Sequence, residues 1–389
     1  MKNETFKAES SDEIVWLRLN RLKSVKLCEN LISEKLSSDA NPSVDEEIIK
    51  SKAIGLSSAI DSAIGYWQVT PQSLNAKVLS RYYFLLQMTI AEQVCSVKNI
   101  YDLKEVQKHT ESGHGLSTIT QPGIDFPENY FTCALRLGHF YSYLKSIGID
   151  TKKYDFEKRP RKFTDVTERS KIVNLIDLFR RIPELNNVIE EYTGQTPLSF
   201  HIGHSNINMQ NDLVAAKEHT VKTGKFTFKA PITSENKLSY ISFYTHSEKI
   251  TPEYLSTLGL PFTDYKVMKG LSDDENFITG TLLHSGDKYW HQSINVYSSS
   301  YAPTTIVVPL WGSSDNIMIN FTLLYTLSII VRYLPDLWYR INSGDLNHIG
   351  SLIEYYVSII DHVLPLEMLE RITGAEIEIH QPGSIFGSV

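Results

Sequence analysis

His114 is the residue in this sequence whose surroundings best suit chemistry. It lies between Gly113 and Gly115 and follows Glu111 and Ser112. Glycines on both sides let the backbone approach a ligand closely. An imidazole on an exposed turn can act as an acid, a base or a phosphate contact near neutral pH. The alternative is a histidine that only stabilises the turn. We take His114 as the first candidate catalytic residue.

Tyr82 and Tyr83 form an adjacent pair in an apolar segment. On a helix, neighbouring side chains point about 100° apart, so one tyrosine should enter the core. The other could face a cleft and hold His114 or a ligand through its hydroxyl, which makes both tyrosines candidate catalytic residues. The alternative is core packing with one hydroxyl satisfied. Arg81 and Gln87, in the same segment, are weaker candidates for ligand binding.

Arg332, Tyr333 and Trp338 close a second apolar segment. An arginine at a helix C-terminus interacts favourably with the helix dipole and can bond the last carbonyls. The alternative is an anion contact in a cleft between lobes. Arg332 and Trp338 are therefore further candidate ligand-binding residues.

His201 and His204 are the only closely spaced histidine pair. On a helix, histidines three residues apart could share a metal ion. Gly203 favours a loop or strand instead, and in a strand the two side chains face opposite sides. Asp212 follows, but no matching third ligand is evident, so we expect no metal site.

Residues 152–181 form the one basic stretch, with ten Lys or Arg against five Asp or Glu. Tyr154, Phe156 and Phe163 lie among these charges, a pattern typical of single-strand or phosphate binding. The five carboxylates favour the alternative of a solvated face with local salt bridges.

Several common catalytic signatures are absent from the sequence. It contains no G-x-x-x-x-G-K-[ST] phosphate loop, no G-x-G-x-x-G, no G-x-S-x-G and no H-E-x-x-H. Their absence argues against the common ATPases, dehydrogenases, hydrolases and zinc proteases. We expect no cofactor, and whether the protein is an enzyme stays open.

The composition is that of an ordinary globular protein. The 389 residues are 42% hydrophobic and 21% charged, enough for two or three lobes. A net charge of -7 gives no global basic field for nucleic acid. Three scattered cysteines make no disulfide framework, which indicates a reducing cytoplasm. The polar N-terminus lacks a signal core, and polar residues interrupt the most apolar stretch, 317–331, so we expect a core helix and no membrane span.

Hydrophobic periodicity predicts a helix-rich α+β fold. The expected helices are 11–36, 44–65, 74–97, 172–179, 184–193, 315–333 and 346–363, with a natural start at Pro71 for the third. The expected strands of a mostly antiparallel sheet are 226–229, 240–245, 279–283 and 304–308. The predicted segments are a helical lobe (1–150), a basic helical connector (151–222), a β-rich region (223–312) and C-terminal helices that pack on the core (313–389).

Short motifs along the chain resemble the YaaC-like family of bacterial proteins. The segment 327–338, Leu-Ser-Ile-Ile-Val-Arg-Tyr-Leu-Pro-Asp-Leu-Trp, is similar to the family's helix-end signature. Four other segments resemble parts of the family's sequence and keep the family's order along the chain: Trp16-Leu-Arg-Leu, Arg81-Tyr-Tyr-Phe, His114-Gly-Leu and Ile182-Pro-Glu-Leu. The helical lobe departs from the pattern at Ile90-Ala-Glu, where a Lys-Ala pair is usual.

A tyrosine-pair helix followed by a loop histidine also looks like a HEPN-type helical lobe. Catalytic HEPN ribonucleases resemble one another in an Arg followed by His after four to six residues, and no Arg in this sequence has that spacing. The resemblance implies a nucleotide- or RNA-linked binding and regulatory protein, in stress or phage defence. The alternatives are an RNA- or nucleotide-cleaving effector that uses His114, whose expression should arrest growth, and a structural assembly partner. The many tyrosines could also support a homodimer.

Overall fold

The structure is a computed structural model. It describes residues 2–38, 45–68, 73–205, 236–245, 247–269 and 276–380, with short pieces at 214, 217–218, 220–222 and 382. The predicted strand 226–229, Asp212 and the predicted helix start at Pro71 lie outside the described residues.

Internal contacts divide the chain into two compact units. Unit 1 consists of Met1–Leu178, Trp311–Ser313 and Ile317–Val389, and unit 2 of Phe179–Leu310 and Ser314–Asn316. Unit 1 is therefore built from both ends of the chain. The division into four segments drawn from composition is finer than these units and stays a prediction.

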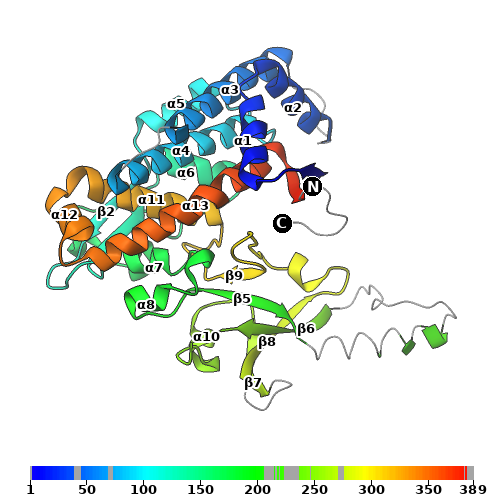
Figure 1. Cartoon of the computed structure of the whole chain (residues 1–389), viewed down its shortest axis with the longest axis vertical. Coiled ribbons are helices and arrows are strands. Elements are labelled where there is room, and N and C mark those ends of the chain that lie inside the picture. Colours follow the sequence, from blue (N-terminus) through cyan, green and yellow to red (C-terminus); the bar gives the residue numbers. More distant parts are fainter. Residues whose placement is uncertain are drawn as a thin grey trace. The chain divides into compact units, whose positions relative to one another are not determined.

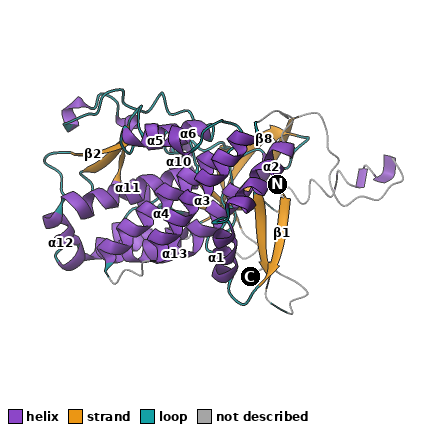
Figure 2. Ribbon diagram, turned by 90° about the horizontal axis from the view of Figure 1, so that it is seen from above, coloured by secondary structure: helices purple, strands orange, loops and turns teal. Residues whose placement is uncertain are grey.

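Unit 1 is mainly helical, with α4 (Leu74–Cys95) at its centre. Helix α4 packs against α3 (Glu46–Gln68) and α13 (Asn347–Thr373), and the three lie side by side in Figure 2. Most residues of α4 are buried, in keeping with a sequence that is apolar around much of the helix circumference. The other helices of the unit are α1 (Ser11–Arg21), α2 (Val25–Ser38), α5 (Leu103–Glu111), α6 (His139–Ser146), α11 (Asn316–Tyr333) and α12 (Pro335–Ser343).

Helix α11 is apolar and long enough to cross a membrane, judged by length and composition alone. However, 78% of it is buried inside the protein. A helix that is apolar on all sides and covered by protein is a core helix, in keeping with the prediction for this stretch.

Two of the long predicted helices differ from the structure in extent. The segment 11–36 is not one helix, because a turn at 22–24 separates α1 from α2. Helix α13, predicted to end at 363, continues through Pro365 to Thr373. A proline removes one backbone donor, but Leu364 and Leu369 on either side of it are fully buried. Packing outweighs the lost hydrogen bond there.

Unit 1 also contains two small sheets. Strands β1 (Lys2–Lys7) and β10 (Ala375–His380) pair in parallel and join the two ends of the chain. Strands β2 (Leu116–Thr120), β3 (Tyr130–Ala134) and β4 (Ile172–Asn174) form an antiparallel sheet in that order. The predicted helix 172–179 is thus wrong at its start, and only α7 (Leu175–Phe179) is helical.

Unit 2 is built on a five-stranded antiparallel sheet in the order β7-β8-β6-β5-β9 (Figure 1). Its strands are β5 (Ser199–His204), β6 (Asn236–Tyr244), β7 (Thr263–Lys269), β8 (Asn276–Ser285) and β9 (Thr305–Val307). Alternate residues such as Phe200, Ile202 and Phe243 bury one face in an apolar cluster. The short helices α8 (Ile189–Thr193) and α10 (Pro252–Thr257) belong to the same unit.

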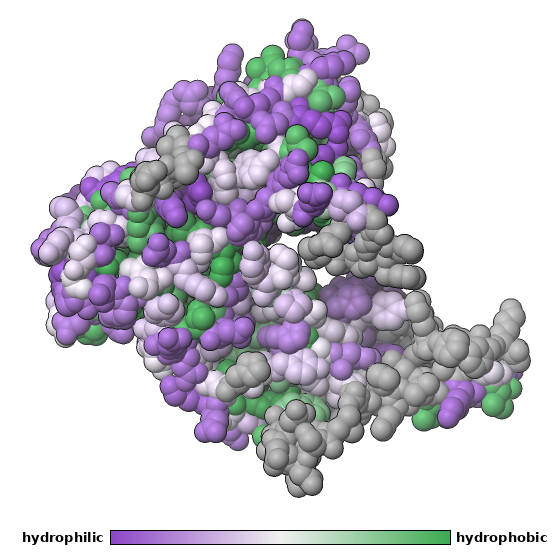
Figure 3. All heavy atoms as spheres, in the orientation of Figure 1, coloured by the Kyte–Doolittle hydropathy of each residue, from purple (hydrophilic) through white to green (hydrophobic). Residues whose placement is uncertain are grey.

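The predicted fold class is confirmed: N-terminal helices, central antiparallel sheets and C-terminal helices make a helix-rich α+β protein. On the face seen in Figure 3, apolar residues lie in small patches among hydrophilic ones.

Candidate functional site

A glycine-flanked loop holds His114 against the start of α6. Gly113 and Gly115 adopt φ values of 103° and 81°, which favour glycine. The backbone N–H of His139 donates to the carbonyl of Gly113 at 2.9 Å, and that of Phe140 donates to the carbonyl of His114 at 3.0 Å. The backbone N–H groups at the start of α6 have no partner within the helix, and they hold the His114 loop in place through these hydrogen bonds.

The side chain of His114 is joined to the central helix by a hydrogen bond. The Tyr82 hydroxyl lies 2.8 Å from Nδ1 of His114. Tyr82 is fully buried, and burial raises the pKa of its phenol, so the hydroxyl keeps its proton. When this hydroxyl donates to Nδ1, the proton of the neutral imidazole resides on Nε2. Within the part of the chain that the structure describes, Nε2 has no hydrogen-bond partner.

His114 is held in its neutral form. Burial lowers the pKa of His114, and the positive charge of Arg332 lowers it further. A histidine that is neutral at pH 7 is a poor general acid, because it lacks the proton to give. It can still donate one hydrogen bond from Nε2 to an oxygen of a ligand.

Arg332, at the end of α11, supplies the positive charge beside His114. Its Nε donates to the Ser328 carbonyl at 3.1 Å and Nη2 to the Ser328 hydroxyl at 3.1 Å. Its Nη1 lies 3.4 Å from the hydroxyl of Tyr83, and its guanidinium carbon lies 5.9 Å from the ring centre of Tyr82. The structure therefore brings four predicted residues together: Tyr82, Tyr83, His114 and Arg332. We call these four residues the His114 cluster.

Tyr325 is part of the same environment and was not predicted. Its ring centre lies 5.8 Å from that of His114 and 6.0 Å from that of Tyr82. It precedes Arg332 by two turns on α11, so the two side chains share a helix face. That spacing was visible in the sequence and could have identified it.

Other predicted site residues lie outside the cluster. Arg81 forms a two-bond ion pair with Asp361 at 2.6 and 2.9 Å and stacks on Trp67 at 3.9 Å. These contacts give Arg81 a structural role, because they link α4 to α13. Gln87 lies one turn beyond Tyr83, and Trp338 lies on α12. Among the described residues, neither side chain has a hydrogen bond to the cluster.

The predicted alternatives for the histidine pair and the basic stretch can be compared with the structure. His201 and His204 lie on β5, where a separation of three places them on opposite faces. No metal-binding group of His, Cys, Asp or Glu occurs among the described residues. In the basic stretch, Lys171 contacts the exposed Glu168 at 3.1 Å, which fits a solvated face with local salt bridges. Asp155 of the same stretch is buried and pairs at 2.8 Å with Arg136, which lies outside the stretch.

Residues 22–372 match the sequence profile of the family described as YaaC-like Protein. The chain belongs to the YaaC-like family. The match includes both halves of unit 1 and every residue of the His114 cluster. No curated protein and no solved structure matches this YaaC-like chain.

Proposed function

We propose that this YaaC-like protein is a nucleotide- or RNA-linked binding and regulatory protein whose His114 cluster contacts a phosphate group. The observation that carries the proposal is that Arg332 has no carboxylate partner among the described residues. Four other arginines of unit 1 form ion pairs with carboxylates: Arg81–Asp361, Arg136–Asp155, Arg340–Asp345 and Arg371–Glu92. Within the described part of the chain, the hydrogen-bond partners of Arg332 are hydroxyl and carbonyl oxygens, and none is a carboxylate.

A half-buried guanidinium without a carboxylate is a good partner for an added anion. Nε2 of His114 and the hydroxyl of Tyr83 supply neutral donors in the same cluster. Tyr333 adds an aromatic face, since its ring centre lies 5.2 Å from the guanidinium carbon of Arg332. Tyr333 also lines a cavity of about 490 Å³ with Tyr130 and Arg340. A phosphate with an attached planar group fits this set of side chains.

Regulation in stress or phage defence is the setting that we propose for this binding. It is supported by the helical lobe with a tyrosine pair and a loop histidine, and by the lack of a catalytic Arg–His spacing. The HEPN-like character of the lobe remains part of this proposal.

The first test is binding by full-length protein to ATP, measured by calorimetry, and to a labelled single-stranded RNA, measured by anisotropy. We expect Arg332→Gln to weaken binding about tenfold or more, because a charged hydrogen bond contributes ~1.5–3 kcal/mol. Arg169→Gln is the matched control, since that exposed arginine also stacks on aromatic rings, at 4.2 Å from Phe131. No binding below millimolar concentration, or equal losses in the two variants, would contradict the proposal.

A cleaving effector is the second candidate, favoured by the hydrogen bond between Tyr82 and His114. The lowered pKa of His114 leaves it the role of base rather than acid. Expression of the wild-type protein should then arrest growth with degraded RNA or depleted nucleotide, and His114→Ala should relieve the arrest. Normal growth of both strains with intact RNA would contradict the cleaving effector and leave the binding role as the proposed function.

A further inference from the structure

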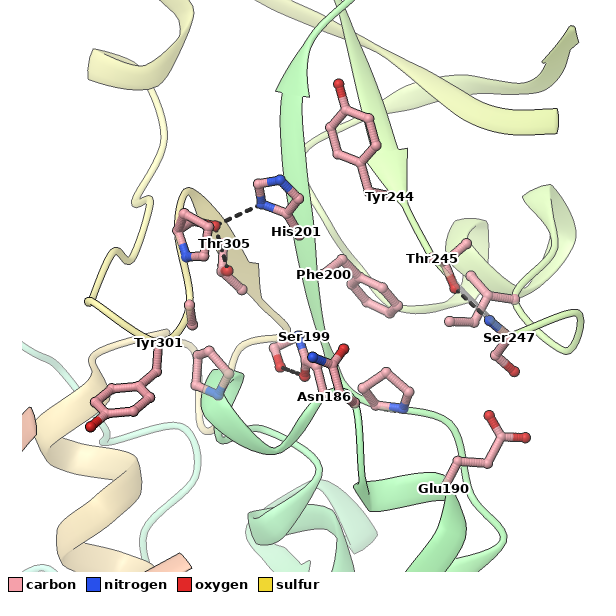
Figure 4. Close-up of a pocket in the computed structure, with 16 residues that line it drawn as sticks. Asn186, Glu190, Ser199, Phe200, His201, Tyr244, Thr245, Ser247, Tyr301 and Thr305 are labelled. Atoms are coloured by element: carbon pink, nitrogen blue, oxygen red, sulfur yellow. Dashed lines mark hydrogen bonds between the residues drawn. The ribbon is translucent and has the colours of Figure 1, made fainter. Parts of the chain in front are cut away.

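Unit 2 contains a cavity that is separate from the His114 cluster. Its volume is about 620 Å³, within the range of small-molecule sites. It is lined by β5, β6, the segment 183–190 and the segment 301–305 (Figure 4). Among the described residues that line it, the side chains are mainly hydroxyl, amide, aromatic and proline groups, and none is a lysine or arginine.

A stacked pair of rings forms one wall of this cavity. His201 on β5 and Tyr244 on β6 are direct register partners, so their side chains leave the same face of the sheet. Their ring centres are 4.9 Å apart, with 29° between the planes. Tyr244 remains 49% exposed, which leaves ring surface available to a ligand.

Gly203 makes this arrangement possible. A Cβ at that position would lie 2.8 Å from Cε2 of the Tyr244 ring and 3.0 Å from its hydroxyl oxygen. Real Cβ atoms do not approach so closely, so any other residue would displace the ring. The glycine lets Tyr244 lie over strand β5 beside His201.

The cavity also presents hydrogen-bonding groups of both kinds. Nδ1 of His201 donates to the Pro303 carbonyl at 2.7 Å, which leaves Nε2 of the neutral ring as an acceptor. Oδ1 of Asn186 accepts from the Ser199 hydroxyl, which leaves the amide NH₂ as a donor. In Figure 4, Asn186 and Ser199 lie between the rings of His201 and Tyr244 on one side and Glu190 on the other.

Glu190 is the carboxylate of this cavity. Lys249 contacts it at 2.7 Å, and hydrogen bonds from Lys249 and Ser247 lower the pKa of Glu190. It is ionised at neutral pH and can accept hydrogen bonds from sugar hydroxyls. The described residues that line the cavity include no lysine or arginine to bind a phosphate, and the neighbouring Lys249 is already paired with Glu190.

We propose that this cavity binds an uncharged nucleoside, with the base stacked on Tyr244 and His201 and the sugar hydroxyls near Glu190. A planar base matches the ring pair, because stacking on an aromatic side chain accepts any base. The amide of Asn186 then meets the edge of the base. The site goes beyond the phosphate contact proposed for Arg332 and rests on different residues.

The experiment is calorimetric titration of the full-length protein with adenosine, guanosine, cytidine and uridine. AMP and adenosine are then compared on the Arg332→Gln protein, which lacks the proposed phosphate contact. We expect saturable binding of at least one nucleoside at micromolar to millimolar concentration, and no tighter binding of AMP than of adenosine by the Arg332→Gln protein. Tyr244→Ala should weaken the binding about tenfold or more, and Gly203→Ala should act in the same direction.

Tyr289→Ala is the matched control. Tyr289 is also 49% exposed and stacks on a histidine, His291, with ring centres 5.7 Å apart, but it does not line this cavity. It should leave the nucleoside affinity unchanged. Absence of binding by all four nucleosides overturns the proposal. So does wild-type affinity in a folded Tyr244→Ala protein, checked by circular dichroism, or much tighter binding of AMP than of adenosine by the Arg332→Gln protein.

Discussion

His114 lies on the glycine-flanked loop and His139 at the start of α6, and backbone hydrogen bonds join these two segments. Burial keeps both side chains neutral. Burial lowers the pKa of His139 to about 3, and the positive charges that His114 and His109 can carry lower it further. Its Nε2 lies 2.8 Å from the hydroxyl of Thr89, but its Nδ1 has no hydrogen-bond partner among the described residues. The two histidines differ in exposure, since His114 is half-buried and can meet a ligand, whereas His139 is fully buried.

His139 should make the protein sensitive to acid. Its pKa is about 3 when folded and near 6.5 when unfolded, so between these values only the unfolded chain takes up the proton. Stability therefore falls as the pH falls through this window. Between pH 7 and pH 5 we expect His139 to account for a loss of about 2 kcal/mol. His139→Leu should remove this part of the loss, measured by urea unfolding at both pH values.

His348→Leu is the control for this measurement. His348 is exposed, so its replacement should leave the loss of stability between pH 7 and pH 5 as in the wild type. An equal pH dependence of the wild type and His139→Leu would show that His139 does not titrate in this way.

At the residue scale, the sequence identified Tyr82, Tyr83, His114 and Arg332 by residue type and neighbours. It could not identify partners that depend on tertiary contacts. Asp361, which pairs with Arg81, lies in a helix far along the chain. The cavity of unit 2 was missed for the same reason, because its rings come from two strands that only the sheet register brings together.

The contact between the His114 loop and α6 is a backbone contact that allows no side chain between them. Gly138, which precedes α6, adopts a φ of 87°. A Cβ there would lie 2.5 Å from the carbonyl oxygen of Gly113 and 2.6 Å from the nitrogen of Gly115. Both are backbone atoms that cannot turn away.

We expect Gly138→Ala to lower the free energy of unfolding by about 3 kcal/mol or more, because a backbone clash adds to the strain of a positive φ. Gly113→Ala is the matched control, since Gly113 has a φ of 103° but no atom within 4 Å of an added Cβ. Its cost should be only about 1–2 kcal/mol, from the backbone conformation alone. Similar losses in the two variants, measured by urea unfolding, would contradict the close contact.

At the element scale, long apolar segments were predicted well. The expected helices 74–97 and 315–333 agree closely with α4 and α11, because their apolar residues continue over many turns. The short strands β2, β4 and β7 were missed. Strands of three to seven residues carry too few alternations to distinguish a strand from a loop or a helix turn.

At the scale of the whole molecule, unit 1 is discontinuous in sequence, because unit 2 is inserted between its two main parts. Tyr82 on α4 contacts Phe321 and Tyr325 of α11, with ring centres 5.8 and 6.0 Å away. Arg81 on the same helix pairs with Asp361 of α13. The core of unit 1 therefore requires residues from before and after the insertion.

A fragment of residues 1–178 should not fold, since it leaves the apolar faces of α4 without α11 and α13. We expect it to aggregate or to bind the dye ANS strongly. A fragment of residues 179–316 keeps the five-stranded sheet and its apolar cluster, and we expect a cooperative thermal transition from it. A well-folded 1–178 fragment, shown by dispersed NMR signals, would contradict this description of the core.

At this scale the sequence predicted the fold class but not the connectivity. The parallel pairing of β1 with β10 joins opposite ends of the chain, and neither strand has a local partner that marks it. Pairing between such distant segments depends on how the helices between them pack, and no pattern within a short window contains that information.

The discontinuity of unit 1 also has a consequence during translation. Helix α4 is complete at Cys95, but α13 ends only at Thr373, after the whole of unit 2 has been made. At synthesis rates of about 5–20 residues per second, the nascent helix waits on the order of tens of seconds for its partner. During that time its apolar surface is available to ribosome-associated chaperones.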